Sequence, residues 1–204
     1  MGTINNTAYK VKVDVVDDDS NLNREEGALY LNNGELKIGT QSVTKTVRTD
    51  KDTGWASYID GQYSSGSPFT VSANTDTVLP NNAATVINGQ IPTDVTAFYS
   101  DNKITGRSGD NLDIMIYFKA VPSATSQWLD IWIDIGGSIG ELYRHTFSFP
   151  KGAGTSRGIL YSLSSAYTLD TWETNGGTVY IRSNASLDVY GVNFNFDRSH
   201  KANN

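Results

Sequence analysis

The stretch that decides the fold is Trp128-Leu129-Asp130-Ile131-Trp132-Ile133-Asp134-Ile135. Successive side chains of a β-strand point to opposite faces of the sheet, so this alternation predicts a strand with one face in the core. The leucine and the three isoleucines form that core face. The other face carries Trp128, Asp130, Trp132 and Asp134 and is expected to point outward or toward a partner.

The same period of two recurs on both sides of this stretch. Two further core faces are predicted, one of Leu112, Ile114, Ile116 and Phe118 and one of Tyr190, Val192, Phe194 and Phe196. Between turns rich in glycine, serine and asparagine we place strands at 56–59, 69–71, 77–79, 85–87, 103–105, 112–118, 128–135, 142–149, 158–163, 178–183 and 186–196. Only residues 166–172 favour a helical turn. Many short strands with regular turn signals indicate an all-β protein, and we expect an antiparallel β-sandwich of the jelly-roll type.

The first 50 residues are more polar and form a region of their own. An Asn32-Asn33-Gly34 turn separates two short apolar runs, and Asn-Gly in that position predicts a β-hairpin. The apolar side chains of this hairpin are Leu29, Tyr30, Leu31, Leu36 and Ile38. Such a hairpin is marginally stable alone, so we expect it to dock on a larger surface. The expected organisation is a docking region and linker at 1–50, the sandwich at 51–198 and a tail at 199–204.

Composition excludes several classes of partner. The chain has 204 residues, a net charge of −6 and no cysteine, so it must bury a core without disulfides. Lysine and arginine are not clustered, which argues against nucleic acids and anionic membrane surfaces as partners. A membrane span needs about 18 consecutive apolar residues, and the sequence has no such run. Residues 1–10 are polar, so we expect no signal peptide and synthesis in the cytoplasm.

One acidic segment has some features of a calcium loop. Oxygen-bearing side chains alternate from Asp17 to Asn23. An EF-hand loop beginning at Asp17 needs glycine and glutamate where this chain has Leu22 and Ala28. We therefore expect a solvated loop or a partner contact in preference to calcium, and no metal or other cofactor.

The paired carboxylates of the central strand do not fit catalysis. Glycoside hydrolysis needs two carboxylates roughly 5–10 Å apart. Asp130 and Asp134 are four residues apart on one strand, which places them roughly 13 Å apart. The single strand histidine, His145, is expected to be a packed or interface residue. We expect no catalytic residues and no enzyme.

From Trp55 onward, the order and spacing of features resemble a known group of domains. The features are Trp55–Asp60, Ser67–Val71, a turn at Val78–Asn82, Gly109-Asp110, Trp128–Ile131, Asn175–Gly177 and Val189–Phe194. They resemble the jelly-roll domains of virion proteins of tailed, marine bacteriophages, including head-decoration and fibre-tip proteins. No single motif is specific, and the resemblance covers about residues 54–198. Residues 27–34 are similar to the short hairpins that precede such domains in virion fibres.

The resemblance implies a non-enzymatic structural protein of the virion that forms a homotrimer. We expect a capsid decoration or cement protein, made in the host cytoplasm and anchored by residues 1–50 to the major capsid protein or another virion protein. The outward residues Trp128, Asp130, Trp132 and Asp134 are then expected to form a subunit seam, because large aromatic side chains are enriched in interface cores. The alternative is a tail or head fibre tip in which this face binds a host surface glycan.

Overall fold

The computed structural model describes residues 14–16, 29–32, 35–39, 44–46 and 52–202. The chain divides into two compact units, residues 1–49 and residues 50–204. No helix in these ranges is long and apolar enough to span a membrane.

The first unit contains one small sheet. Its strands are β1 (Asp14–Val16), β2 (Leu29–Asn32), β3 (Glu35–Gly39) and β4 (Thr44–Thr46), in that order across the sheet. The predicted hairpin is confirmed, because β2 and β3 pair antiparallel with Leu29 opposite Ile38 and Asn32 opposite Glu35. Its turn residues, 33–34, and the acidic segment Asp17–Asn23 lie outside the described residues.

The second unit is built from two antiparallel sheets. The first has the order β14-β11-β16-β5-β8, with β6 also beside β16. Its strands are β5 (Gly54–Ile59), β6 (Phe69–Val71), β8 (Thr85–Gln90), β11 (Asn111–Pro122), β14 (Arg157–Tyr167) and β16 (Leu187–His200). The second has the order β13-β12-β15-β7. Its strands are β7 (Thr77–Val78), β12 (Gln127–Asp134), β13 (Glu141–Phe149) and β15 (Thr178–Ser183).

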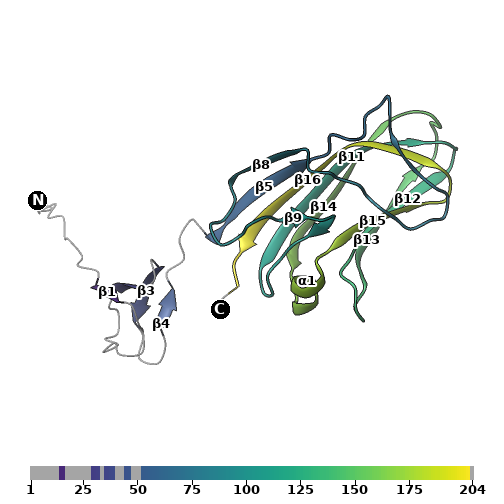
Figure 1. Cartoon of the computed structure of the whole chain (residues 1–204). Helices are drawn as coiled ribbons and strands as arrows, with labels where there is room; N and C mark the ends of the chain where they lie inside the picture. Colours follow the sequence, from purple (N-terminus) through teal and green to yellow (C-terminus); the bar gives the residue numbers. More distant parts are fainter. Residues whose placement is uncertain (1–13, 17–28, 33–34, 40–43, 47–51, 203–204) are drawn as a thin grey trace, which may run out of the picture. The chain divides into compact units, whose positions relative to one another are not determined.

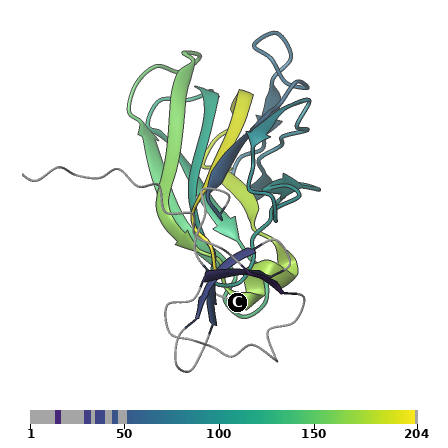
Figure 2. The ribbon, with the colours of Figure 1, turned by 90° about the vertical axis from the view of Figure 1, so that its left-hand side faces the viewer.

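Two smaller elements complete this unit. Strands β9 (Tyr99–Ser100) and β10 (Lys103–Ile104) form a short hairpin, and Ile104 bridges to Gly177 just before β15. The helix α1 (Asp170–Asn175) lies at one end of the second sheet (Figure 1). The two sheets are seen as two layers in Figure 1 and from a second side in Figure 2.

The chain changes sheet repeatedly along its length. It passes from β11 in the first sheet to β12 and β13 in the second, returns for β14, crosses to β15 and ends with β16 in the first. The prediction of an all-β antiparallel sandwich preceded by a hairpin region is confirmed. The jelly-roll type within this class remains a prediction, which this interleaved strand order favours.

The core lies between the two sheets. Leu129, Ile131 and Ile133 on β12 are fully buried, as are Ile116 and Phe118 on β11. These are the residues that the alternation placed in the core, because inward positions of a half-buried strand must be apolar. A fully buried Leu, Ile or Phe side chain contributes about 1.5–3 kcal/mol each, so these two faces supply much of the folding free energy.

One predicted core face was wrong in part. Tyr190 is half-buried and Val189 is fully buried. The reason is an irregularity at Gly191, whose φ is +63° and where the pairing with β11 shifts register. An extra residue in one strand reverses which side chains face inward before it. The core face of β16 is therefore Leu187 and Val189 before Gly191, and Val192, Phe194 and Phe196 after it.

Several predicted boundaries also differ, and two of them change the type of element. Strand β14 continues to Tyr167, with the buried Ala166 opposite Leu112, so the helix begins at Asp170 and the helical turn expected at 166–172 was placed too early. Strand β16 runs to His200, so the tail expected at 199–204 begins inside a strand.

Candidate functional site

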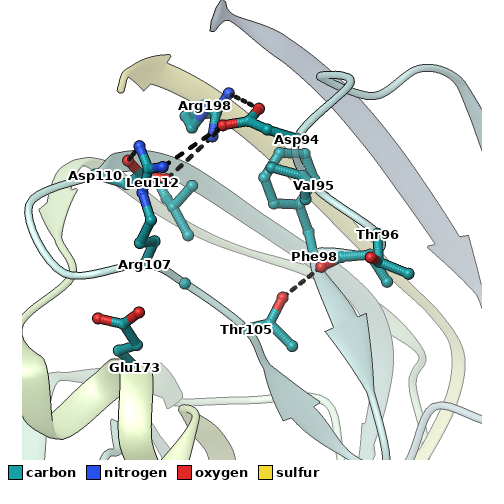
Figure 3. Close-up of a pocket in the computed structure, with 12 residues that line it drawn as sticks. Asp94, Val95, Thr96, Phe98, Thr105, Arg107, Asp110, Leu112, Glu173 and Arg198 are labelled. Carbon is teal, nitrogen blue, oxygen red and sulfur yellow. Dashed lines mark hydrogen bonds and ion pairs between the residues drawn. The ribbon is translucent and has the colours of Figure 1, made fainter. Parts of the chain in front are cut away.

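A guanidinium group is buried at one end of the sandwich. Arg198 on β16 occupies an inward position and its side chain is only 1% exposed. Burying a charge is costly unless it is paired and hydrogen-bonded. Arg198 Nη2 donates to Asp94 Oδ1 at 2.6 Å, Nη1 to Asp110 Oδ2 at 3.2 Å, and Nε to the backbone oxygen of Asp52 at 2.8 Å. Figure 3 shows Arg198 between the two carboxylates.

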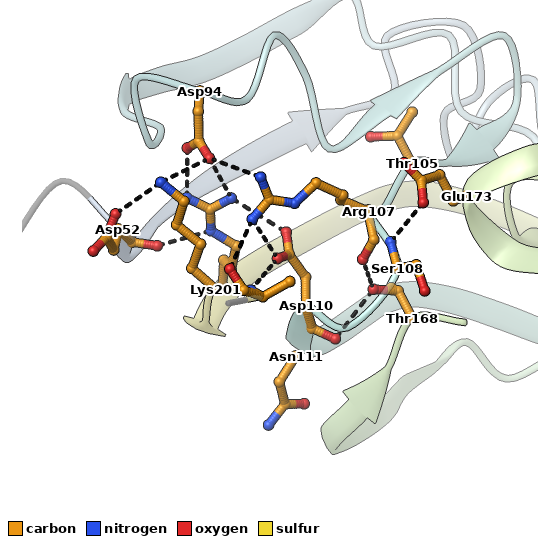
Figure 4. Close-up of polar contacts among 12 residues, drawn as sticks. Asp52, Asp94, Thr105, Arg107, Ser108, Asp110, Asn111, Thr168, Glu173 and Lys201 are labelled. Atoms are coloured by element: carbon orange, nitrogen blue, oxygen red, sulfur yellow. Dashed lines mark hydrogen bonds and ion pairs between the residues drawn. The ribbon is translucent and has the colours of Figure 1, made fainter. Parts of the chain in front are cut away.

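Two further cations join the same carboxylates. Arg107 Nη2 lies 3.3 Å from Asp110 Oδ1, and its Nη1 lies 3.7 Å from Asp94 Oδ2. Lys201 Nζ lies 3.1 Å from Asp52 Oδ1 and 3.4 Å from Asp94 Oδ2. We call these six residues, Asp52, Asp94, Arg107, Asp110, Arg198 and Lys201, the ion-pair cluster (Figure 4). Its three carboxylates balance its three cations.

Contacts within the cluster favour the charged forms of Asp94, Arg198 and Lys201. Burial alone would raise the pKa of Asp94, but the hydrogen bond and the charge of Arg198, with the charge of Lys201, lower it below its usual value. Burial alone would lower the pKa of Arg198, but its hydrogen bond to Asp94 and the charges of Asp110 and Asp94 raise it. The pKa of Lys201 is raised in the same way by Asp52 and Asp94, against its burial.

The cluster joins the two ends of the second unit. Asp52 is the first described residue of that unit, and Arg198 and Lys201 come from its last described segment. The backbone N–H of Ala202 also donates to Asp110 Oδ1 at 2.7 Å. Consequently the entry and exit of the chain are held together at the same end of the sandwich.

A cavity of about 230 Å³ adjoins the cluster (Figure 3). Four cluster residues line it, together with apolar side chains and a carboxylate of α1: Asp94, Arg107, Asp110, Arg198, Val95, Phe98, Leu112 and Glu173. Glu173 Oε2 accepts a hydrogen bond from the backbone of Ser108 at 3.0 Å (Figure 4). The charged groups of the ion-pair cluster are bonded mainly to one another. The cluster therefore links the separate chain segments that carry these groups. Among the described residues, no group of three or more histidine, aspartate or glutamate side chains could hold a metal ion.

The four residues singled out on the central strand share one face of β12, as predicted. Trp132, however, is only 3% exposed. The guanidinium carbon of Arg144 lies 3.8 Å from the centre of its ring, and the ring of Tyr180 stacks on it with centroids 5.7 Å apart. The chain therefore covers Trp132 with neighbours from β13 and β15. Sequence reasoning missed both neighbours, because strand alternation does not reveal which strands pair.

The other three residues of that face are only partly buried. Asp130 accepts hydrogen bonds from Thr146 at 2.6 Å and from Arg144 at 2.8 Å. Asp134 accepts one from the backbone of Gly136 at 2.7 Å. Trp128 has its backbone N–H bonded to Asn184. Whether this face forms a subunit seam or binds a glycan stays a prediction.

An exposed apolar patch on the first sheet was not predicted. Met115 and Tyr117 point outward from β11, and Leu160 lies opposite Tyr117 on β14. Their exposed fractions are 46%, 38% and 52%. We call these three residues the β11–β14 patch. Alternation places each of them outward, but only the pairing of β11 with β14 brings them together. Neighbouring exposed apolar side chains are typical of protein–protein contacts.

No protein-family model and no curated protein matches this sequence. Solved structures give remote likenesses. PRD1 vertex protein P5 is 14% identical with a TM-score of 0.42, over 78% of this chain and 78% of that chain. The Eiger TNF of S. frugiperda is 10% identical with a TM-score of 0.44, over 74% of this chain and 96% of that one. A chain of the T13 viral particle of IBDV is 13% identical with a TM-score of 0.35, over 80% of this chain but 35% of that one. The first is a vertex protein, and the third is part of a viral particle. At these identities and TM-scores, the likenesses fix neither a family nor a function for this chain.

Proposed function

We propose that this protein is a non-enzymatic structural component of a bacteriophage virion, a homotrimeric decoration protein of the capsid. The observation that carries the proposal is the division of the chain into a small N-terminal sheet and a separate, fully cored sandwich. A protein that decorates a particle needs an attachment element and a stable body, and these two units can take those roles.

The N-terminal unit is the proposed attachment element, with the major capsid protein or another virion protein as its partner. Its described strands are three to five residues long. A sheet of such short strands gains most of its stability by packing against a larger surface. The hairpin side chains Leu29, Tyr30, Leu31, Leu36 and Ile38 are the proposed contacts.

The sandwich is the proposed trimeric body. The β11–β14 patch supports contacts between copies of this chain, because monomers rarely leave neighbouring large apolar side chains exposed. The ion-pair cluster supports the attachment role of the first unit, since it anchors Asp52, just after the boundary between the units, to β16. A pulling force applied to the chain before Asp52 would therefore act on β16 through these bonds.

The proposal is tested by counting copies. Purified particles would be analysed by mass spectrometry for the molar ratio of this chain to the major capsid protein. A decoration protein is expected in a constant ratio near that of capsid subunits or capsomers, and sedimentation of the free protein should show a trimer. A ratio of a few copies per particle would instead support a fibre tip, and absence from particles together with a purely monomeric protein would overturn the proposal.

A further inference from the structure

A second pocket, of about 320 Å³, lies at the end of the second sheet, and no residue of the ion-pair cluster lines it. Four segments meet there: the glycine turn after β12, the end of α1, the start of β15 and strand β10. The side chains that carry the argument are Lys103, Asp134, Thr178 and Tyr180.

The walls of this pocket are fixed by hydrogen bonds. Gly136 and Gly137 both have positive φ, at 69° and 62°, which favours glycine because it has no Cβ. The side-chain amide of Asn175 donates to the backbone oxygen of Ile135 at 2.9 Å and so holds α1 to the glycine turn. Ile104 and Gly177 exchange two backbone hydrogen bonds, at 2.7 and 2.8 Å. The pocket is therefore preformed.

Its polar groups are available to a ligand. Within the described part of the chain, the ammonium of Lys103 and the hydroxyls of Thr178 and Tyr180 make no hydrogen bond or ion pair. Asp134 uses one carboxylate oxygen for the backbone of Gly136 and leaves the other free. The residues that line the pocket thus carry an ammonium, two hydroxyls and a free carboxylate oxygen.

An oriented aromatic ring stands beside these groups. Tyr180 stacks on Trp132 with an angle of 15° between the rings, and the guanidinium of Arg144 lies over the Trp132 ring as well. The stack restrains the ring of Tyr180, which lines the pocket. Trp132 itself is covered and cannot contact a ligand. A ligand in the pocket can instead contact Tyr180.

The chemistry of the pocket selects a class of ligand. An anion would meet Asp134 and a cation would meet Lys103, so the charges together favour a neutral molecule. A saccharide ring carries hydroxyls that both donate and accept, which matches this mixture of groups, and an apolar C–H face that can contact an aromatic ring. We infer that this pocket is a binding subsite for a neutral saccharide, an activity beyond decoration of a particle.

The test uses the full-length protein on an array of neutral and acidic oligosaccharides. Neutral oligosaccharides are expected to bind, and the affinity for them should fall about tenfold in Lys103→Met and in Asp134→Asn, because each change removes a charged hydrogen-bonding partner. Asparagine can still accept the bond from Gly136, so the turn should be preserved. Lys119→Met is the matched control, because Lys119 lies on the first sheet over the ring of Tyr190, and it should leave binding unchanged.

Three results would overturn the inference. They are the absence of binding to any neutral oligosaccharide, binding to acidic oligosaccharides alone, and binding that Lys103→Met and Asp134→Asn leave at the wild-type level. Circular dichroism and the melting temperature of each variant show that a loss of binding is not a loss of fold. The copy number on particles is independent of all three results, so this test and the test of the proposed function can fail separately.

Discussion

Arg198 is the single side chain whose replacement should destabilise the sandwich most among the charged residues. Its guanidinium is only 1% exposed and lies between the carboxylates of Asp94 and Asp110. We expect Arg198→Met to lower the free energy of unfolding by about 3 kcal/mol, since it breaks a buried ion pair and leaves the buried carboxylate of Asp110 with only Arg107 and the backbone N–H of Ala202 as partners. Urea unfolding of the two proteins at pH 7 measures the difference.

A matched arginine on the surface provides the control. Arg182 pairs with Asp76 at 3.3 Å, but the two side chains are 39% and 53% exposed. Exposed ion pairs contribute under about 1 kcal/mol, so Arg182→Met should be nearly neutral. If the two substitutions cost the same, burial does not determine the strength of the cluster and our account of it fails.

Neighbouring residues on β12 should respond in opposite ways to substitution. Ile131 is fully buried, and Ile131→Asp would place an unpaired charge in the core, which costs several kcal/mol and should abolish folding. Asp130 bonds Thr146 and Arg144 at the surface, so Asp130→Ala should cost about 1 kcal/mol. Expression, circular dichroism and thermal unfolding distinguish the two. Equal stability of both variants would contradict the assignment of faces on this strand.

Alternation predicted these faces because it depends only on the geometry of one strand. The same reasoning could not predict what covers Trp132, since Arg144 and Tyr180 come from strands at other places in the sequence. Nor could it find the ion-pair cluster. Asp52, Asp94, Asp110 and Arg198 lie far apart along the chain, and only the folded sheet brings them together.

At the level of elements, β16 carries a like-charge contact with β11. Asp197 lies directly opposite Asp113 in the pairing of these strands. Burial raises the pKa of Asp197 above its usual value of 3.8, and the charge of Asp113 raises it further. A carboxylate with a raised pKa destabilises the folded state at pH values above that pKa. The cost vanishes below the usual pKa, where the group is protonated in both states.

This contact predicts a pH-dependent gain in stability. Asp197→Asn should raise the free energy of unfolding by about 0.5 kcal/mol at pH 7, the size expected for opposite like charges in a sheet. The gain should shrink as the pH is lowered and disappear near pH 3, where wild-type Asp197 is also uncharged. Urea titrations at both pH values measure it. A gain of the same size at pH 3 and pH 7 would mean that charge is not the cause.

Strand β16 also shows where element prediction reaches its limit. Its second half follows simple alternation, and Val192, Phe194 and Phe196 are buried as predicted. Before Gly191 the pattern is reversed, because the chain there has a positive φ and loses register with β11. A glycine inside an apolar strand is compatible with a bulge, but its position in the register depends on the partner strand.

For the whole molecule, the change in composition near residue 50 predicts a docking region, a sandwich and a tail, and this organisation stays a prediction. The two compact units are residues 1–49 and 50–204, with the predicted hairpin in the first. The structure of either unit alone does not establish whether that unit is the attachment element or the trimeric body. These roles depend on partner surfaces, and the sequence of one chain does not encode the particle it joins.

These roles can be separated by deletion of residues 1–50. The truncated chain keeps Asp52 and therefore the whole ion-pair cluster, and it keeps both sheets and the core of the sandwich. We expect its melting temperature to stay within about 3 °C of that of the sandwich in the full chain, a change of about 1 kcal/mol or less for a domain of this size. Sedimentation should still show a trimer, because the proposed contacts between copies lie on β11 and β14.

Binding to particles, by contrast, should be lost. Full-length and truncated protein would each be mixed with virions that lack the protein, and the fraction that co-sediments would be measured. The hairpin of β2 and β3 carries the proposed contacts with the virion. The full chain should therefore sediment with virions, and the truncated chain should stay in the supernatant. A second truncation lacks residues 1–52 and therefore Asp52 as well. It should have a lower melting temperature, because the loss of Asp52 weakens the cluster around Arg198. If the truncated chain that keeps Asp52 binds virions as well as the full chain, the sandwich itself is the attachment element, and the β11–β14 patch becomes the first surface to mutate.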